Sequence, residues 1–205
     1  MTETNAISKR RIVFVMNPIS GTQGKRTILR YIHQLMDRER CDYQLVRTKY
    51  AGHATEIAKQ AVDEGVDMVV AIGGDGTINE IAKALVHSNT ALGIIPCGSG
   101  NGLARHLRIP MEPKAAVELI NSGKRLCIDY GKINGLPFFC TCGVGFDAFV
   151  SLKFADSGKR GLLTYLENTL HESLTYKPET YEIENEEGTQ RYNAFLIACG
   201  NASQY

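Results

Sequence analysis

The sequence predicts an α/β protein: a three-layer α/β/α domain built on a parallel sheet, followed by a β-rich domain. Short apolar runs alternate with amphipathic helical patterns from Arg11 to about Cys127, which is typical of parallel strands covered on both faces. Strand-like runs joined by turn residues dominate the rest of the chain. With 43% hydrophobic and 22% charged residues, the 205-residue chain resembles a globular protein with one core and part of a second. We expect a first domain over residues 9–124 and a second over 125–205.

The first domain is expected to alternate four strands with four helices. Apolar side chains recur at helical spacing in each helical segment, as with Ile28, Ile32 and Leu35 in the first. Gly65 suits the position just past the second helix, and Pro96 closes the fourth strand. The strands are expected at residues 11–16, 43–48, 67–72 and 91–96, and the helices at 24–40, 53–65, 77–87 and 113–124.

The second domain is expected to be mostly strands, with one helix over residues 161–174. The strand-like runs lie at residues 125–133, 137–146, 180–188 and 191–200. The last run is an apolar strand suited to a covered central position, yet the sequence ends six residues after Cys199 with no further element to cover it. We therefore expect this β-rich domain to be truncated.

Composition identifies no partner, and a nucleic acid or an anionic membrane would have to bind a local charged patch. The net charge of +1 gives no overall attraction to nucleic acid or to anionic membranes, so we expect no nucleic-acid partner. The N-terminal MTETNAISKR has no signal-peptide core, and no stretch approaches the roughly 20 apolar residues that span a bilayer. A cytoplasmic location is therefore expected.

The cysteines predict no metal site. They lie mostly in apolar strand-like runs, without C-x-x-C pairs or a histidine at zinc-ligand spacing, so we interpret them as buried thiols. The six cysteines are Cys41, Cys97, Cys127, Cys140, Cys142 and Cys199.

Four loops carry the residues that suggest chemistry. They follow the four predicted strands, and the carboxyl ends of parallel strands meet at one edge of the sheet, where ligands bind. Glycines and hydroxyl side chains let backbone N–H groups approach phosphate oxygens. NPISG alone is explained equally well by a tight turn, but four such loops at one edge predict a phosphate site. The loops are NPISG (residues 17–21), Thr48, GGDG (residues 73–76) and PCGSGN (residues 96–101).

Asp75 is the informative residue of the third loop. A carboxylate beside phosphate-binding loops repels the ligand unless a cation or a transferable proton is present, so the motif predicts phosphoryl transfer. No partner that would give Asp75 a structural role is evident from the sequence. Asn79 and Glu80 are expected on the first turn of the next helix, where Glu80 suits either helix capping or nucleotide contact.

The motifs together resemble the diacylglycerol kinase catalytic-domain family, which includes bacterial lipid kinases and sphingosine kinases. GGDGTINE, the upstream NPISG and the downstream IIPCGSGNGLARHL agree with it in order and spacing. The similarity continues through DYGKINGLPFF and CGVGFDA to NASQY, nearly the whole chain. The resemblance implies a nucleotide-binding α/β domain followed by a β-sandwich, with ATP and Mg²⁺ as cofactors and a lipid hydroxyl as acceptor.

The resemblance also implies which residues act. Asp75 matches the essential acid of the family, which acts on the acceptor hydroxyl or through the water network of the metal. A further magnesium-binding acid and a general base lie in a later part of the family's β-sandwich, so no metal ligand is expected here and this chain alone should turn over little. The implied nucleotide contacts are Asn17, Ser20, Gly21, Thr48, Gly73, Gly74, Asp75, Gly76, Thr77, Asn79, Glu80 and Ser99.

One position departs from the bacterial diacylglycerol kinases. Many of them carry Asn-Asp where this chain has Asn101-Gly102, whereas sphingosine kinases have a small residue there. Gly102 cannot join a carboxylate network around the metal. Both diacylglycerol and long-chain bases therefore stay open as the acceptor.

Other basic residues are given structural interpretations first. Arg105 and His106 are read as a surface or cap pair rather than as phosphate ligands. The segment with Lys153, Lys159 and Arg160 is read as a core helix with solvated flanks, ahead of a basic–apolar face for a membrane surface.

Two other functions compete with the lipid kinase. NAD kinase shares a GGDG loop on a related fold, and a regulatory nucleotide-binding domain would keep the loops without the chemistry. The first and fourth loops favour the lipid kinases over NAD kinase. The presence of Asp75 argues against a regulatory domain that has lost catalysis. The partners expected are a lipid substrate, a peripheral contact with the inner membrane face and, as an open alternative, a homodimer.

Overall fold

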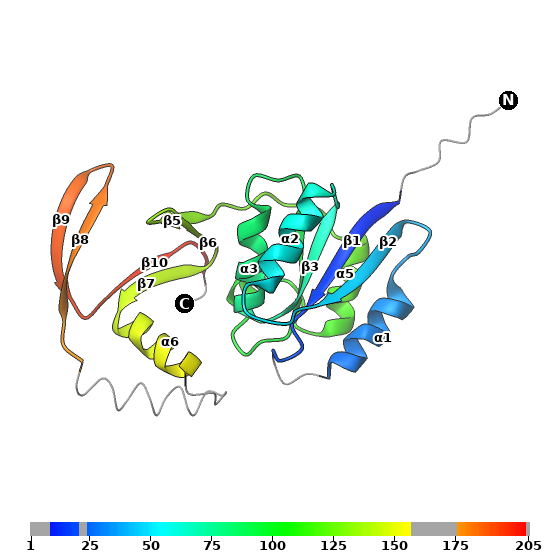
Figure 1. Cartoon of the computed structure of the whole chain (residues 1–205), viewed down its shortest axis with the longest axis horizontal. Helices are drawn as coiled ribbons and strands as arrows, with labels where there is room; N and C mark the ends of the chain where they lie inside the picture. Colours follow the sequence, from blue (N-terminus) through cyan, green and yellow to red (C-terminus); the bar gives the residue numbers. More distant parts are fainter. Residues whose placement is uncertain (1–8, 21–23, 157–175, 204–205) are drawn as a thin grey trace. The chain divides into compact units, whose positions relative to one another are not determined.

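The computed structural model describes residues 9–20, 24–156 and 176–203, without the side chains of residues 153–156. The chain divides into two compact units (Figure 1). Unit 1 comprises Met1–Cys140 and Asn201–Tyr205, and unit 2 comprises Thr141–Gly200. A compact unit need not coincide with an independently folding domain. The domain boundary expected near Arg125 therefore stays a prediction.

Unit 1 is built on a four-stranded parallel sheet with the strand order β2-β1-β3-β4. β1 lies centrally because its apolar run pairs on both sides: Phe14 stands opposite Leu45 on one neighbour and Val70 on the other. The predicted parallel sheet is confirmed. Its strands are β1 (Arg10–Met16), β2 (Cys41–Arg47), β3 (Met68–Gly73) and β4 (Ala91–Pro96).

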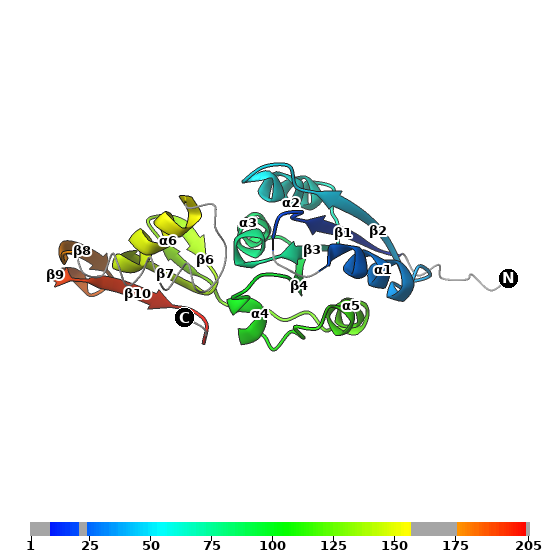
Figure 2. The same cartoon turned by 90° about the horizontal axis from the view of Figure 1, so that it is seen from below.

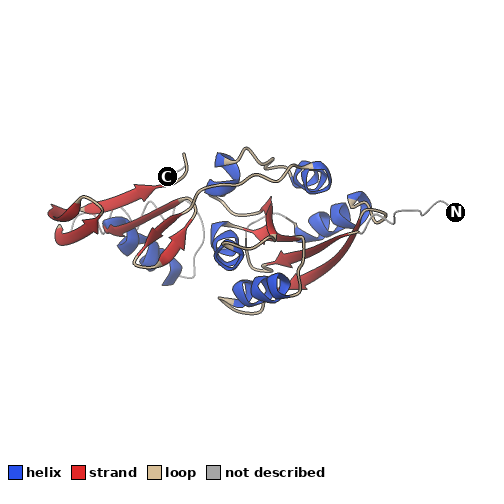
Figure 3. Cartoon of the chain, turned by 90° about the horizontal axis from the view of Figure 1, so that it is seen from above, coloured by secondary structure: helices blue, strands red, loops and turns tan. Residues whose placement is uncertain are grey.

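Helices cover both faces of this sheet, as Figures 2 and 3 show. α1 and α5 pack on one face, and α2 and α3 pack on the other. The predicted three-layer α/β/α arrangement is therefore confirmed. The helices of unit 1 are α1 (Lys25–Leu35), α2 (His53–Asp63), α3 (Asp75–Leu85), α4 (Gly102–His106) and α5 (Pro113–Ser122).

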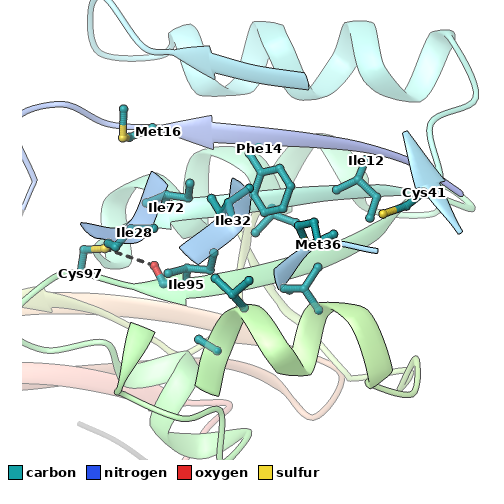
Figure 4. Close-up of a cluster of buried hydrophobic side chains, with 14 residues drawn as sticks. Ile12, Phe14, Met16, Ile28, Ile32, Met36, Cys41, Ile72, Ile95 and Cys97 are labelled. Atoms are coloured by element: carbon teal, nitrogen blue, oxygen red, sulfur yellow. Dashed lines mark hydrogen bonds between the residues drawn. The ribbon is translucent and has the colours of Figure 1, made fainter. Parts of the chain in front are cut away.

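The core of unit 1 is two apolar layers separated by the sheet. Figure 4 shows the layer under α1 and α5, where Phe14 and Ile72 from the strands gather with Ile32 of α1. Alternation along each strand sends Val13 and Val15 to the opposite layer, against α2 and α3. This two-sided burial explains why the strands are continuous apolar runs.

α1 ends earlier than its apolar pattern predicts. The expected helix over residues 24–40 stops at Leu35, and residues 38–40 form a turn. The Asp37 carboxylate accepts a hydrogen bond from the N–H of Glu39 at 3.0 Å, and the carbonyl of Asp37 accepts the N–H of Cys41 at 2.9 Å. These local bonds give the backbone an alternative to another helical turn.

Unit 1 closes with a short hairpin instead of the long strand expected over residues 125–133. Only β5 (Gly131–Ile133) is extended in a sheet, and it pairs with β6 (Leu136–Phe138). Asn134 and Gly135 both have positive φ, as a two-residue hairpin turn requires. The preceding residues are tied instead by Arg125, whose guanidinium binds the carbonyl and the carboxylate of Asp67.

Unit 2 consists of antiparallel strand pairs and one helix. β10 (Leu196–Gly200) pairs with β7 (Thr141–Gly145), and β8 (Glu179–Asn185) pairs with β9 (Gly188–Ala194). The strand predicted over residues 191–200 is thus two strands, which separate at Phe195 and pair with different neighbours.

The helix α6 (Phe146–Asp156) was not predicted from the sequence. Its apolar residues are spread around the helix, so they give no amphipathic stripe. Among the side chains of α6 that the structure describes, those of Phe146 and Val150 are buried. The helix predicted over residues 161–174, with Lys159 and Arg160, lies outside the described residues. No helix in the described part of the chain is both long enough and apolar enough to cross a bilayer.

Candidate functional site

The four predicted loops meet at the carboxyl edge of the sheet in unit 1. Hydrogen bonds continue the strand pairing into the loops: Asn17 N donates to Ile72 O at 3.1 Å, and Thr48 N donates to Met16 O at 2.9 Å. The chain leaves β1 toward β2 on one side, whereas β3 lies on its other side. Ligands of open parallel sheets bind at this kind of switch point, here between the loops after β1 and β3.

Asn17 joins the two loops at this switch point. Its side-chain Nδ2 lies 3.3 Å from Oγ1 of Thr77, which is buried in the first turn of α3. Its Oδ1 accepts the N–H of Ile19 at 3.1 Å, which bends the first loop over the strand end. Asn17 therefore fixes the first loop against the start of α3.

Lys25 is a member of the site that sequence reasoning missed. Its ammonium group donates to the backbone carbonyls of Asn17 and Ser20 and lies 2.8 Å from Ser20 Oγ. A cation in the first turn of a helix is disfavoured by the helix dipole. A bound anion would offset this unfavourable interaction with the dipole. A lysine at the predicted start of a helix is thus the sequence signal that could have identified Lys25 as a site residue.

The third and fourth loops touch through glycines. A Cβ on Gly98 would lie 2.7 Å from Cα of Gly74, and a Cβ on Gly100 would lie 2.9 Å from the Asp75 carboxylate. A side chain at either position would collide with backbone or with the acid. By contrast, a Cβ on Gly76 would meet open space. The glycines let the two loops approach each other while the start of α3 stays open.

The Asp75 carboxylate has two backbone partners that the sequence did not reveal. One oxygen accepts the N–H of Asn101 at 2.8 Å, and the other accepts the N–H of Gly102 at 2.7 Å. Asp75 thereby binds the start of α4 while remaining exposed to solvent. Each carboxylate oxygen keeps a further lone pair for a proton or a metal-bound water.

Asn101 shapes the fourth loop and also escaped the sequence-based site list. It has a left-handed backbone with φ of 55° and a buried side chain, which asparagine tolerates better than most residues. Its Oδ1 accepts the N–H of Gly98 at 2.9 Å and its Nδ2 donates to Gly98 O at 2.7 Å. This reciprocal pair closes the loop around Ser99, which is exposed.

The remaining predicted residues are placed less centrally. α3 begins at Asp75, so Asn79 and Glu80 lie in its second turn rather than its first, and Glu80 does not cap the helix. The carbonyl of Glu80 accepts a hydrogen bond from Oγ1 of Thr55 at 2.9 Å. Thr48 is half-buried directly after β2, and Gly21 lies outside the described residues.

Arg105 and His106 are exposed, and each has a defined partner. Arg105 Nε donates to the carbonyl of Gly100 at 2.8 Å, so its guanidinium supports the fourth loop. Nδ1 of His106 accepts the backbone N–H of Ser203 at 3.0 Å. Both residues thus hold backbone, in line with the structural interpretation of this pair.

The start of α3 is one place in this arrangement that could receive the phosphates of a nucleotide. The first N–H groups of α3 have no partner within the helix, and the open face at Gly76 gives an anion access to them. The ammonium of Lys25, the first residue of α1, contacts the loop after β1. Among the residues that the structure describes, no group of three or more His, Cys, Asp or Glu side chains could hold a metal ion.

Comparisons with known proteins agree on one family. Residues 11–133 match the model of the diacylglycerol kinase catalytic domain. A probable YegS-like lipid kinase of Klebsiella pneumoniae is 32% identical over 191 residues, which cover 91% of this chain and 64% of that protein. A diacylglycerol kinase of Bacillus subtilis is 37% identical over 140 residues, covering 66% of this chain and 46% of that protein.

A solved structure shows the same fold. The crystal structure of a putative diacylglycerol kinase from Bacillus anthracis aligns with a TM-score of 0.78 at 25% identity, covering 96% of this chain and 68% of that one. The chain spans 64% of the Klebsiella relative and less than half of the Bacillus subtilis enzyme.

Proposed function

Because the chain belongs to the diacylglycerol kinase catalytic-domain family, we propose that it is the nucleotide-binding part of an ATP-dependent lipid kinase. The reaction proposed is transfer of the γ-phosphoryl group to a lipid hydroxyl of the diacylglycerol or sphingoid-base type. The observation that carries the proposal is the constrained acid: Asp75, positioned by two N–H groups at the point where two glycine loops meet.

Each loop has a part in this proposal. The N–H groups at the start of α3 would face the phosphates, and Lys25 and Asn17 would hold the first loop around them. Ser99 and Thr48 would make further nucleotide contacts from the neighbouring loops. ATP with Mg²⁺ supplies the transferable group and neutralises its charge.

Asp75 would handle the proton or the metal's water. The two N–H groups at the start of α4 fix the orientation of the carboxylate and leave one lone pair on each oxygen. One exposed carboxylate of this kind can accept the proton of an acceptor hydroxyl or hold a metal-bound water. It cannot by itself hold Mg²⁺, which requires further oxygen ligands.

The location and the partners belong to the same proposal. A lipid acceptor requires contact with a membrane surface, which places the protein peripherally at the cytoplasmic face of the membrane. Neither a nucleic acid nor a second copy of the chain is needed for this activity.

A phosphorylation assay tests the activity. The protein expressed from its complete gene is supplied with ATP and Mg²⁺ against diacylglycerol, monoacylglycerol, a sphingoid base and NAD. Lipid-dependent product is expected, and Asp75→Asn should abolish it. Product from NAD alone would instead favour the related NAD kinases.

The nucleotide site is tested separately on this chain. A non-hydrolysable ATP analogue should shift the amide NMR signals of Gly74, Thr77 and Ser99. Gly188, the first residue of β9 in unit 2, serves as the reference outside unit 1. A response confined to unit 2 would show that the site is assigned wrongly.

A further inference from the structure

Two cysteines of unit 2 face each other across neighbouring strands. Cys142 of β7 stands directly opposite Cys199 of the antiparallel strand β10. The two strands run side by side in Figure 1. Burial raises the pKa of the Cys142 thiol, and the neighbouring Cys199 thiol raises it further. Sequence reasoning treated these residues as separate buried thiols, but Cys142 is only half-buried and Cys199 is exposed.

This register meets the geometric requirement for a disulfide. Opposite residues of an antiparallel pair have Cα atoms about 4.5 or 5.5 Å apart, and their side chains leave the same face of the sheet. Disulfides usually join Cα atoms about 4.4–6.8 Å apart. Phe146 N donates to Phe195 O and Asn201 N donates to Cys140 O in the same register, so Cys142 and Cys199 form a hydrogen-bonded pair with Cα atoms about 5.5 Å apart. A disulfide is reached there by rotation of the two side chains and a small approach of the two strands.

We propose that Cys142 and Cys199 are an oxidation site, at which a peroxide converts the dithiol into a reversible cross-strand disulfide. The site is independent of the proposed kinase activity. It belongs to unit 2, whereas the candidate nucleotide-binding residues belong to unit 1.

The chemistry needs one peroxide for each pair of thiols. The more exposed Cys199 thiolate attacks the peroxide, so that an S–O bond forms, the O–O bond breaks and one water leaves. The Cys142 sulfur then attacks the sulfenic acid of Cys199, so that the S–S bond forms and the second water leaves. The peroxide is reduced, the two thiols are oxidised, and a small dithiol reverses the reaction by exchange.

None of the other cysteines stands opposite a cysteine in the described strands: Cys41 of β2 faces Arg10, and Cys97, Cys127 and Cys140 lie outside the strands. Cys41 and Cys97 are buried, which limits the access of a peroxide to their sulfurs. Cys127 is exposed, but it lies outside the strands of the described residues and has no cysteine opposite it. Cys127 therefore controls for exposure without pairing.

Peptide mapping tests the site. The folded chain is treated with hydrogen peroxide, alkylated with iodoacetamide and digested without reductant for mass spectrometry. The expected result is a Cys142–Cys199 linked peptide that dithiothreitol abolishes, and two of the six cysteines should escape alkylation when the oxidised chain is unfolded before iodoacetamide is added. Cys142→Ser and Cys199→Ser should each lose the linkage, whereas Cys127→Ser should keep it.

Two results would overturn the proposal. One is alkylation of both Cys142 and Cys199 under conditions in which Cys127 is already oxidised. The other is equal linkage in chain unfolded by urea, because linkage would then not depend on the strand register. Phenylarsine oxide, which bridges close dithiols, gives a second readout on the unmodified chain: stoichiometric uptake supports the pairing, and no uptake contradicts it.

Discussion

At the residue scale, Asp75 serves both the architecture and the proposed chemistry. The sequence indicated an exposed acid without a partner, but its carboxylate holds two N–H groups at the start of α4. A change at this position therefore affects the fourth loop as well as any reaction. A test of its role has to separate the two effects.

Asp75→Asn is expected to lower both stability and activity. The amide keeps one acceptor oxygen but turns an NH₂ group toward an N–H donor, which should cost about 1 kcal/mol of folding free energy. Loss of the acid should reduce lipid phosphorylation about a hundredfold or more. Denaturant unfolding and turnover per folded molecule measure the two effects.

Asp63→Asn is the matched control, because Asp63 is exposed near the end of α2. It should leave both quantities near their original values. Near-normal turnover per folded molecule of Asp75→Asn would show that the carboxylate is structural only.

A pair of glycine substitutions tests the contact between the third and fourth loops. Gly98→Ala would place a Cβ 2.7 Å from Cα of Gly74, so the loops must separate, at an expected loss of about 1–3 kcal/mol of stability. Gly76→Ala adds the same methyl group in open space within the first turn of α3, where it should be neutral or stabilising by up to about 1 kcal/mol. Equal melting temperatures for the two variants would contradict the close approach.

At the element scale, α5 begins at a side-chain cap. Glu112 accepts the N–H of Ala115 at 2.7 Å, and Pro113 occupies the first helical position. Hydrogen bonds from the backbone of Lys114 and Ala115 lower the pKa of Glu112 below its usual value of 4.5. The ionised Glu112 carboxylate therefore accepts these N–H groups more strongly than the protonated carboxyl group does.

Glu112→Gln is expected to lower the melting temperature slightly at neutral pH. Because the folded-state pKa is depressed, the cap's contribution is fully present above the unfolded-state pKa and is lost as the pH falls through the folded-state value. The difference between wild type and Glu112→Gln should therefore shrink below about pH 4.5. Thermal unfolding across this range measures it.

Glu118→Gln provides the comparison on the same helix. Glu118 is exposed and makes only a 3.9 Å ion pair with Lys114, so its loss should have little effect. A difference for Glu112→Gln that persists unchanged at low pH would show that the charge of the cap is irrelevant.

The sequence predicted elements well where the pattern depended on burial alone. β4 covers the predicted residues 91–96, because a strand buried on both faces must be apolar throughout. The end of α1 was wrong because the turn at Asp37 competes locally with the helix. α6 was missed because its apolar residues form no single stripe.

The candidate site was predictable to the level of its loops. Sheet topology alone brings the four strand ends to one edge, so the motifs after them had to lie together. The contacts of Lys25 and Asn101 could not be predicted, because they depend on how each loop folds back on itself. The partners of Asp75 depend on the close approach of two loops that are separate in the sequence.

At the scale of the whole molecule, the two units differ in how much they bury. Nearly all buried apolar side chains of the described residues belong to unit 1. Phe146 and Val150 are the two that belong to unit 2. Leu196 and Val144, on the paired strands β10 and β7, are 39% exposed. Because apolar burial is the main stabilising contribution, unit 2 is expected to open at a lower free energy than unit 1.

Native-state hydrogen exchange measures this difference. Amides of Ile197 and Cys199, which lie at hydrogen-bonded positions of β10, should exchange faster than those of Phe14 and Val70, which lie in the central strands β1 and β3. Strand amides are compared with strand amides, so differences between helix and sheet do not enter. With less buried apolar surface, β7 and β10 can separate without unfolding the parallel sheet. Uniformly slow exchange in both units would mean that they unfold together, which would contradict a difference in stability.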